Sequence, residues 1–306
     1  MSLQMITPQE PFPALAKAVG LTDIYLKRED LHTYGSHKGR SIPVMIDHYL
    51  KEGSKNFAIS SSGNAALAAA LYVKELNGCP SKELPASDSP LHLDIFVGIH
   101  LAPNKLAKLK KLEDEHIRVL TKERPLQALM AAANEGSTSL RQSTDDIALI
   151  GYKSLAEELA TIPKLAAIFI GTSSGTTAQA LAQYFMDAKV SKMRTPVQVH
   201  VVQTSSCHPL SDAFETYDGE DEQSIANAIV DKTVHRKAAL VPLIKKTGGY
   251  GWFATNDKIR AAQALVREHA GLEISTNSAL SVVGAMESAY RTWTIDGAAV
   301  CVVCGD

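Results

Sequence analysis

Short apolar runs alternate with helical patterns along the chain, and this alternation restricts the possible folds more than any other feature. In one stretch, strands are expected at 92–99 and 117–120, and helices at 103–115 and 125–134. Strands that alternate with helices are typical of parallel sheets joined by right-handed crossovers. The sequence therefore predicts an α/β protein.

The same patterns give the other elements. Further strands are expected at 24–26, 56–60, 165–170, 197–202 and 298–303, and further helices at 41–52, 65–71, 152–160, 178–187, 257–269 and 279–290. Residues 136–150 are expected to cross between two domains. The polar segment 203–250 is expected to be irregular surface or, alternatively, a flap beside a substrate.

Composition narrows the classes of function. The chain has 306 residues, 45% of them hydrophobic and 21% charged, as expected for one or two globular domains. A formal net charge of -2 gives no overall positive field to hold nucleic acid or an anionic membrane. No apolar run approaches the roughly 20 residues of a membrane span. We therefore expect neither nucleic acid nor a membrane as a partner.

The four cysteines are Cys79, Cys207, Cys301 and Cys304. They are too few and too scattered for a disulfide framework, which indicates a reducing compartment. The first ten residues lack the pattern of a secretory signal, so a cytoplasmic protein is expected. Cys301 and Cys304 form a C-x-x-C pair, but a structural zinc site needs a second pair, so no metal is expected. We expect Cys301 to be buried as a small hydrophobic residue.

Three polar stretches could carry chemistry, and the first surrounds Lys38. Residues 35–40 read Gly-Ser-His-Lys-Gly-Arg, between an apolar strand and a helix. A lysine between small residues at such a junction has two interpretations. It is either a solvated side chain at a turn or an amine that acts as a nucleophile, a Schiff-base partner or a proton shuttle.

The second stretch, Ser60-Ser61-Ser62-Gly63-Asn64, precedes an alanine-rich helix. Its hydroxyls and backbone N–H groups stand at a helix N-terminus, where an anion is stabilised. An ordinary helix cap is the alternative.

The third stretch, 171–177, reads Gly-Thr-Ser-Ser-Gly-Thr-Thr between a strand and a helix. Such a turn can hold a phosphate with its N–H groups and hydroxyls. It matches neither the P-loop nor the dinucleotide fingerprint. A tight turn that binds nothing is the alternative.

In chain order, these stretches resemble the fold-type II pyridoxal-phosphate enzymes, the tryptophan synthase β superfamily, over nearly the whole chain. The matching stretches are 26–31, 35–40, 61–64 with the alanine helix, 171–177 and 303–305. The resemblance implies two three-layer α/β/α domains with mainly parallel sheets, pyridoxal 5'-phosphate in the cleft between them, and a homodimer. The larger, cofactor-phosphate-binding domain would comprise 1–45 and 146–306, and the smaller one 46–145.

The resemblance also implies roles for single residues. Lys38 would hold the cofactor as a Schiff base and move protons, and Asn64 would bind the cofactor's phenolic oxygen. A substrate carboxylate would be bound by Ser61, Ser62, Gly63 and Asn64. The cofactor phosphate would be bound by Gly171, Thr172, Ser173, Ser174, Gly175 and Thr176. Cys304 would lie beside the pyridine nitrogen, where the family usually has serine or threonine, and a cysteine there resembles some serine/threonine dehydratases.

Within this superfamily, threonine synthase and threonine/serine dehydratase are most similar, on the 26–31 tract, the Gly-Tyr-Lys-Ser at 151–154, and Glu273 with the polar turn after it. The implied activity is β- or γ-elimination or replacement on a small amino acid, in the manner of threonine synthase acting on phosphohomoserine. The alternatives are a serine/threonine dehydratase and then a cysteine synthase-like enzyme. Tryptophan synthase fits less well because its glycine-rich replacement for the Ser-Gly-Asn turn is absent.

A non-catalytic relative is a further alternative, because the sequence departs from the family pattern in three places. Serines stand in the phosphate turn where many relatives have glycines. The chain ends two residues after Cys304, so we expect one wall of the site to be incomplete or built differently. The 203–250 segment has no clear counterpart of a substrate-phosphate clamp. A Ser/His/Asp hydrolase is disfavoured because no G-x-S-x-G elbow follows a strand.

Overall fold

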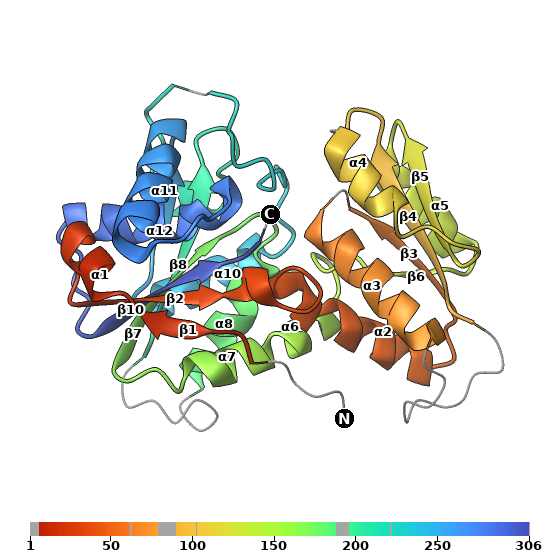
Figure 1. The fold of residues 1–306 in the computed structure, drawn as a ribbon, viewed down its shortest axis with the longest axis horizontal. Coiled ribbons are helices and arrows are strands. Elements are labelled where there is room, and N and C mark those ends of the chain that lie inside the picture. Colours follow the sequence, from red (N-terminus) through yellow and green to blue (C-terminus); the bar gives the residue numbers. More distant parts are fainter. Residues whose placement is uncertain are drawn as a thin grey trace. The chain divides into compact units, whose positions relative to one another are not determined.

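The computed structural model describes residues 6–61, 63–78, 90–101, 103–187, 196–220 and 222–305. The chain forms two compact units (Figure 1). The first unit includes His32–Gly151, and the second includes Ile6–Leu31 and Tyr152–Asp306. Each unit is built on one mainly parallel sheet, which confirms the predicted α/β class. No helix among the described residues is both long and apolar enough to span a membrane.

The second unit contains a six-stranded sheet in the order β1-β2-β10-β7-β8-β9. Its strands are β1 (Gln9–Pro11), β2 (Asp23–Arg28), β7 (Leu165–Gly171), β8 (Gln198–Thr204), β9 (Gly251–Ala254) and β10 (Ala298–Val303). Among these described strands, β1 alone pairs antiparallel, with β2, and the other neighbours are parallel. The carboxyl ends of five strands therefore share one edge, which is where ligands bind in open α/β sheets.

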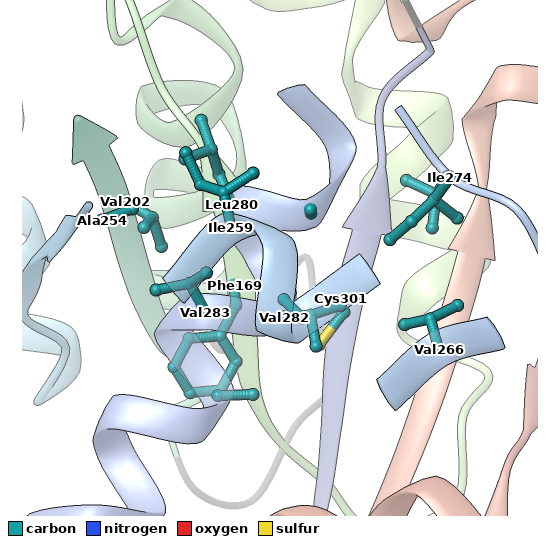
Figure 2. Close-up of a cluster of buried hydrophobic side chains, with 14 of the residues drawn as sticks. Phe169, Val202, Ala254, Ile259, Val266, Ile274, Leu280, Val282, Val283 and Cys301 are labelled. Carbon is teal, nitrogen blue, oxygen red and sulfur yellow. The ribbon is translucent and has the colours of Figure 1, made fainter. Parts of the chain in front are cut away.

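Helices cover both faces of this sheet. They are α1 (Pro13–Val19), α7 (Lys153–Leu159), α8 (Thr176–Met186), α10 (Lys237–Thr247), α11 (Asn256–Ala270) and α12 (Thr276–Tyr290). Figure 1 shows α11 and α12 on one side of the sheet and α7 and α8 on the other. The core between α11, α12 and the sheet is apolar, with Phe169, Val202 and Cys301 among its buried residues (Figure 2).

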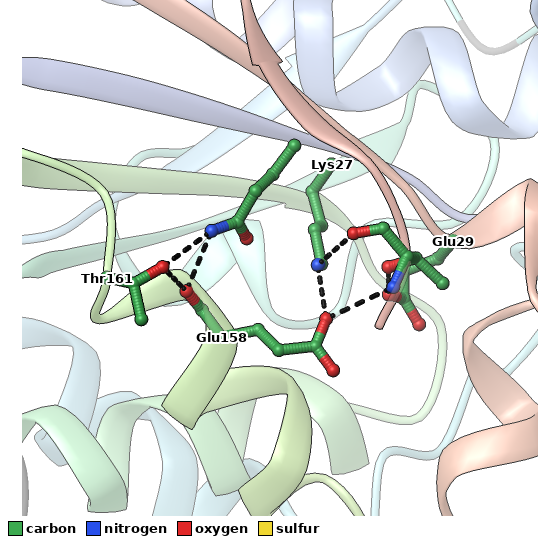
Figure 3. A network of polar contacts seen from close by, with 6 residues as sticks. Lys27, Glu29, Glu158 and Thr161 are labelled. Atoms are coloured by element: carbon green, nitrogen blue, oxygen red, sulfur yellow. Dashed lines mark hydrogen bonds and ion pairs between the residues drawn. The ribbon is translucent and has the colours of Figure 1, made fainter. Parts of the chain in front are cut away.

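Within this unit, a buried polar network joins the first described residues to β2 and α7 (Figure 3). The Lys27 ammonium is completely buried, pairs with the Glu158 carboxylate and donates to the carbonyl oxygen of Thr7 at 2.8 Å. The Thr7 hydroxyl donates to Glu29 at 2.5 Å. Separating Lys27 from Glu158 would leave a buried charge without its partner, which is costly. The pair therefore holds β2, which carries Lys27, against α7, which carries Glu158.

The first unit contains a four-stranded parallel sheet in the order β5-β4-β3-β6. Its strands are β3 (Asn56–Ser60), β4 (His92–Gly98), β5 (Ile117–Lys122) and β6 (Thr138–Ser139). Its helices are α2 (Ile42–Lys51), α3 (Asn64–Gly78), α4 (Pro103–Lys110), α5 (Pro125–Asn134) and α6 (Ile147–Gly151). The short 3-10 helices of the chain are η1 (Glu29–Leu31), η2 (His37–Arg40) and η3 (Ser211–Ala213). In this unit, α3 packs on β4, and α5 packs on β3, β4 and β5.

Among the described residues, the two compact units differ from the predicted domains in two segments. The prediction joined 1–45 and 146–306 to the larger domain, whereas residues 32–45 and 146–151 lie in the first unit. The reason is local packing, because α2 packs on α6 and the Ser41 hydroxyl donates to the carbonyl oxygen of Ala148 at 2.8 Å. The assignment of a function to each domain stays a prediction.

The predicted helix 103–115 ends earlier, at Lys110. Its last acidic residues form the turn into β5 instead. The Asp114 carboxylate accepts the backbone N–H groups of His116 and Ile117, at 2.9 and 3.0 Å, and Glu113 accepts that of Val119 at 2.7 Å. Side chains that bond the local backbone in this way compete with helix formation.

The prediction that 203–250 is irregular was wrong for its last part, which forms α10 (Lys237–Thr247). Leu240 and Ile244 lie one turn apart on this helix and are both completely buried. Pro242 inside the helix hides the pattern in the sequence, because proline usually ends or kinks a helix.

Gly284 allows α12 to approach the sheet closely. A Cβ atom at this position would lie 2.6 Å from Val202 Cγ2 and 2.9 Å from Phe169 Cδ1. We expect Gly284→Ala to lower the free energy of unfolding by about 1–3 kcal/mol, because stiff neighbours must shift. The control is Gly78→Ala, where a Cβ atom meets nothing within 4 Å. Urea denaturation measures both, and equal stabilities of the two variants would contradict the close approach.

Candidate active site

Lys38 is the second residue of η2, which begins directly after Ser36. The Ser36 hydroxyl accepts the backbone N–H of Lys38 at 3.3 Å and so caps this short helix. The Lys38 side chain is half-buried. Its amine forms no hydrogen bond or ion pair with any residue that the structure describes. The amine is therefore available for reaction.

The segment before Lys38 is fixed against α3. Gly35 has a positive φ of 77°, and a Cβ atom there would lie 3.1 Å from Leu67 Cδ2. The Tyr34 hydroxyl donates to the Glu75 carboxylate, and the Tyr34 ring meets the Tyr72 ring edge-on with centroids 5.6 Å apart. Because η2 itself also packs on α3, the lysine has a defined position relative to this helix.

The serine-rich stretch leads from β3 into α3. The strand β3 ends at Ser60 and the helix begins at Asn64. The Ser61 hydroxyl accepts the backbone N–H of Gly63 at 3.3 Å, so its own hydrogen remains free to donate. The half-buried Asn64 side chain has no partner in the described ranges. Ser62 lies outside the described residues.

The turn 171–177 lies in the second unit, between the end of β7 and the start of α8. Gly175 has a left-handed φ of 85°, and a Cβ atom there would lie 2.7 Å from Leu240 Cδ2. The backbone N–H groups of Ser173, Ser174 and Gly175 have no acceptor within the described part of the chain. Free N–H groups at the positive end of an 11-residue helix fit an anion such as phosphate.

The hydroxyls of this turn are not equivalent. Thr172 Oγ1 donates to the carbonyl oxygen of Ile170 at 2.9 Å and points back to its own strand. Ser174 Oγ and Thr176 Oγ1 lie 3.0 Å apart. Ser173 Oγ donates to the Asp231 carboxylate at 2.9 Å and accepts two backbone N–H groups. Thr172 and Ser173 therefore direct their hydroxyl hydrogens to other groups of the protein.

Cys304 follows β10, which pairs with β7 in parallel. The thiol is buried and lies 3.5 Å from the carbonyl oxygen of Val302. The hydroxyls of Ser275 and Ser278 donate to the carbonyl oxygen of Gly305, at 2.7 and 3.1 Å. The start of α12 thus fixes the segment after β10. Because parallel neighbours end at the same edge, Cys304 and the 171–177 turn share that edge.

Two other residues behave as structural groups. Burial raises the pKa of the Cys301 thiol to about 12, which makes it inert, as expected for a core residue. Glu273 forms an exposed ion pair with Arg267, at 2.8 Å between Oε2 and Nη2. The described residues contain no group of three or more His, Cys, Asp or Glu side chains that could hold a metal ion.

Sequence reasoning missed two residues near the 171–177 turn. Ser205 directly follows β8, and its hydroxyl is buried with no hydrogen-bond partner in the described part of the chain. A small polar residue after a parallel strand is a signal that the sequence offered. Asp231 lies 58 positions from Ser173, and only the fold brings them together.

The predicted site residues therefore fall into two groups. Lys38, Ser61, Gly63 and Asn64 belong to the first unit, where η2 and the turn meet on α3. The 171–177 turn and Cys304 belong to the second unit, at one edge of its sheet.

The fold and these two groups define an α/β protein of the fold-type II class. A family model described as "Pyridoxal-phosphate dependent enzyme" matches residues 2–305. The chain belongs to this family, and its cofactor is pyridoxal phosphate. The free N–H groups of the 171–177 turn fit the cofactor's phosphate.

Curated relatives share little sequence identity. The threonine synthase of Mycobacterium leprae is 24% identical over 98% of this chain and 81% of its own length. Human L-serine dehydratase/L-threonine deaminase is 29% identical over 51% of this chain and 44% of its own length.

Solved structures match more completely in fold. A pyridoxal 5'-phosphate-dependent aspartate racemase has a TM-score of 0.80 at 19% identity, over 98% of this chain and 90% of that one. A threonine deaminase from Solanum lycopersicum has a TM-score of 0.76 at 18% identity, over 98% and 84%. At these identities the likeness shows the fold alone, and the predicted fold-type II architecture is confirmed. The homodimer and the cytoplasmic location stay predictions.

Ser205 and Ser211 form a matched pair for a stability test, since both are completely buried. The Ser211 hydroxyl donates to the carbonyl oxygen of Trp252 at 3.0 Å, whereas that of Ser205 has no partner among the described residues. We expect Ser211→Ala to destabilise the cofactor-free protein by about 1–3 kcal/mol, and Ser205→Ala to be neutral or stabilising. Urea denaturation checks this, and an equal loss in both variants would contradict the assignment.

The tyrosines beside the lysine segment predict a change of stability at alkaline pH. Burial and the bond to Glu75 raise the pKa of Tyr34, and burial and the bond to Asp47 raise that of Tyr72. A tyrosine whose pKa is higher in the folded than in the unfolded protein stabilises the fold while it is protonated. This stabilisation is complete below the unfolded pKa of about 10 and is lost as pH rises above that value. The melting temperature should therefore fall above about pH 10. The melting temperature of the double variant Tyr34→Phe/Tyr72→Phe should fall less steeply with pH. Parallel plots of melting temperature against pH for the wild type and the variant would contradict this.

Proposed function

We propose that the protein is a pyridoxal-phosphate-dependent lyase that carries out elimination or replacement at the β or γ carbon of a small amino acid. The observation that carries the proposal is the partner-free amine of Lys38, held by η2 against the same helix that begins with the Ser61–Asn64 turn. A positioned amine beside a carboxylate-binding helix end is what such chemistry needs from the protein.

When bound, pyridoxal phosphate supplies an electron sink for the negative charge left when an amino acid loses its α-hydrogen. Lys38 would hold the cofactor through Nζ. Once released from the cofactor, the neutral Nζ would accept the α-hydrogen as a proton and return a proton to the leaving group. Because the Lys38 side chain is half-buried, a proton on Nζ would exchange less readily with solvent during these transfers.

The turn that leads into α3 would bind and orient the substrate. Ser61 Oγ keeps its hydrogen to donate to the substrate carboxylate, with the N–H of Gly63 already used by Ser61 itself. The amide of Asn64 has donors available for the cofactor's phenolic oxygen and for the carboxylate. The proposed role of Ser62 in the same carboxylate site stays a prediction.

The second unit would hold the other parts of the cofactor. The N–H groups of Ser173, Ser174 and Gly175 and the hydroxyls of Ser174 and Thr176 would bind its phosphate. Gly171 and Thr172 would shape the turn. Cys304 would offer a neutral group to the pyridine nitrogen, which moderates the electron demand of the ring and suits elimination more than transamination.

Two versions of this activity have support. In a threonine synthase-like reaction, phosphate leaves the γ carbon of phosphohomoserine and water adds at the β carbon. The 81% coverage of the Mycobacterium leprae threonine synthase supports this version. In a dehydratase reaction, the α-hydrogen and the β-hydroxyl leave as water, and hydrolysis of the resulting enamine gives a 2-oxo acid and ammonia. Cys304 and the similarity to human L-serine dehydratase/L-threonine deaminase support the second version.

The test compares the wild type with Lys38→Ala and Lys38→Arg after loading with pyridoxal phosphate. We expect the wild type to develop a visible absorbance band and both variants to lack it, because neither has an amine that can react with the cofactor's aldehyde. Turnover in the variants should fall by about 10³-fold or more. A wild type that stays colourless with added cofactor would sink the proposal.

A substrate panel separates an enzyme from a non-catalytic relative. The loaded wild type is incubated with phosphohomoserine, serine, threonine and O-acetylserine, and released phosphate, 2-oxo acid and acetate are measured. Release of any product supports the enzyme. A coloured protein that releases none is a non-catalytic relative.

A further inference from the structure

Residues 222–231, which we call the strap, form an anchored segment in the second unit. Its start is fixed at α11, because the backbone N–H of Asn256 donates to the Glu222 carboxylate at 2.7 Å. The Asn256 side chain in turn accepts the N–H of Ile225 at 2.9 Å. The start of the strap is therefore held by the first residue of a 15-residue helix.

The middle of the strap crosses the start of α12. Ala226 and Ile229 are buried in the core cluster around this helix. The Thr276 hydroxyl donates to the carbonyl oxygen of Ile225 at 3.0 Å, and the Asn277 side chain accepts the N–H of Ala228 at 3.0 Å. The first turn of α12 thus contacts both the strap and, through Ser275 and Ser278, the segment after β10.

The end of the strap lies on the 171–177 turn. Ser173 Oγ accepts the N–H groups of Val230 and Asp231, at 3.1 and 3.2 Å, and donates to Asp231 Oδ2 at 2.9 Å. A serine hydroxyl has one donor and two acceptor sites, so all of its capacity is used. Ser173 therefore positions the strap, and a carboxylate is held beside an anion-binding turn.

A carboxylate such as that of Asp231 is unexpected beside an anion-binding turn, because its negative charge repels a bound phosphate. Its charge also acts on the turn after β8: burial first and the Asp231 charge second raise the pKa of the Cys207 thiol, and the neighbouring Lys232 charge opposes this shift. The N–H groups of Ser173, Ser174 and Gly175 can neutralise one phosphate. A second phosphate nearby would meet the Asp231 carboxylate and the first phosphate together.

The chemistry of the cofactor would bring a substrate toward the turn that holds Asp231 through Ser173. Pyridoxal phosphate carries its reactive aldehyde and its phosphate arm on adjacent ring atoms, so an amino acid bound at the aldehyde would have its side chain near the phosphate. Over distances of several ångströms, unscreened charges in a protein interact strongly enough to change affinity about tenfold or more.

We propose that Asp231 is a specificity-determining residue that disfavours amino acids bearing a side-chain phosphate, so that the substrate class is a hydroxy amino acid with a free hydroxyl. The proposal rests on the lyase function proposed above and chooses its dehydratase version. Asp231 acts by charge, and Ser173 is the positioning residue that holds it.

The experiment compares the cofactor-loaded wild type with Asp231→Asn. Asparagine keeps an oxygen that accepts from Ser173 and removes only the charge. The matched control is Asp257→Asn, whose side chain is 96% exposed on α11 and pairs with Arg260. Dissociation constants for O-phosphohomoserine and for homoserine are measured by spectral titration, and the ratio of the two is the readout.

We expect Asp231→Asn to shift this ratio about tenfold toward the phosphorylated amino acid, while Asp257→Asn leaves it unchanged. In the wild type, raising ionic strength from 0.1 to 1 M should shift the ratio in the same direction, because salt screens the carboxylate. Salt also screens the cofactor phosphate, so the salt response assigns the effect to Asp231 only if it is weaker in the variant than in the wild type. Asp231→Ser, which also removes the charge, replaces Asp231→Asn if that variant fails to fold. A ratio that is the same in the wild type and in the charge-removing variant would overturn the proposal.

Inorganic phosphate binding to the cofactor-free proteins, measured by calorimetry, separates this inference from the function on which it rests. Asp231→Asn should bind phosphate several-fold more tightly than the wild type. If the wild type forms no visible band with pyridoxal phosphate, the proposed function fails, and the phosphate titration still decides the role of Asp231. If the band forms but phosphate affinity is the same in both proteins, the inference alone fails.

Discussion

The parallel arrangement of β10, β7 and β8 is the constraint on which the second unit depends. Parallel neighbours end at the same edge of the sheet, so residues far apart in sequence lie side by side along that edge. They are Cys304 after β10, the 171–177 turn after β7 and Ser205 after β8. The turn then presents free N–H groups at the start of α8. Hydrogen bonds from the start of α12 hold this edge in place. Ser275 donates to the carbonyl oxygen of Gly305 after β10, and Asn277 accepts the N–H of Ala228 in the strap.

In the first unit, the main constraint is the position of one amine, that of Lys38. Most lysines are mobile because their long side chains gain entropy in water. Here the segment before Lys38 is held on α3 by the Gly35–Leu67 approach and by the Tyr34–Glu75 bond. The same helix begins with the Ser61–Asn64 turn. Two groups of unlike chemistry are therefore attached to one rigid element, which favours their use on one ligand.

Much of this arrangement could be predicted from the sequence, for identifiable reasons. The strand β10 and the helix α5 have the predicted bounds, because apolar runs and alanine-rich stretches are strong local signals. The end of α4 and the helix α10 were mispredicted, since Asp114 and Pro242 act against their local pattern. Within the site, residue types indicated the turns, but not the use of the Ser173 hydroxyl by Asp231, which depends on a contact across 58 positions.

The central claim is that the reactive amine of this family member belongs to Lys38. Borohydride reduction of the cofactor-loaded protein makes the link between amine and cofactor permanent, and peptide mass mapping then locates it. The claim predicts a pyridoxyl phosphate label on the peptide containing Lys38, at close to one equivalent per chain. A label on a different lysine, or none on a protein that shows the visible band, would contradict it.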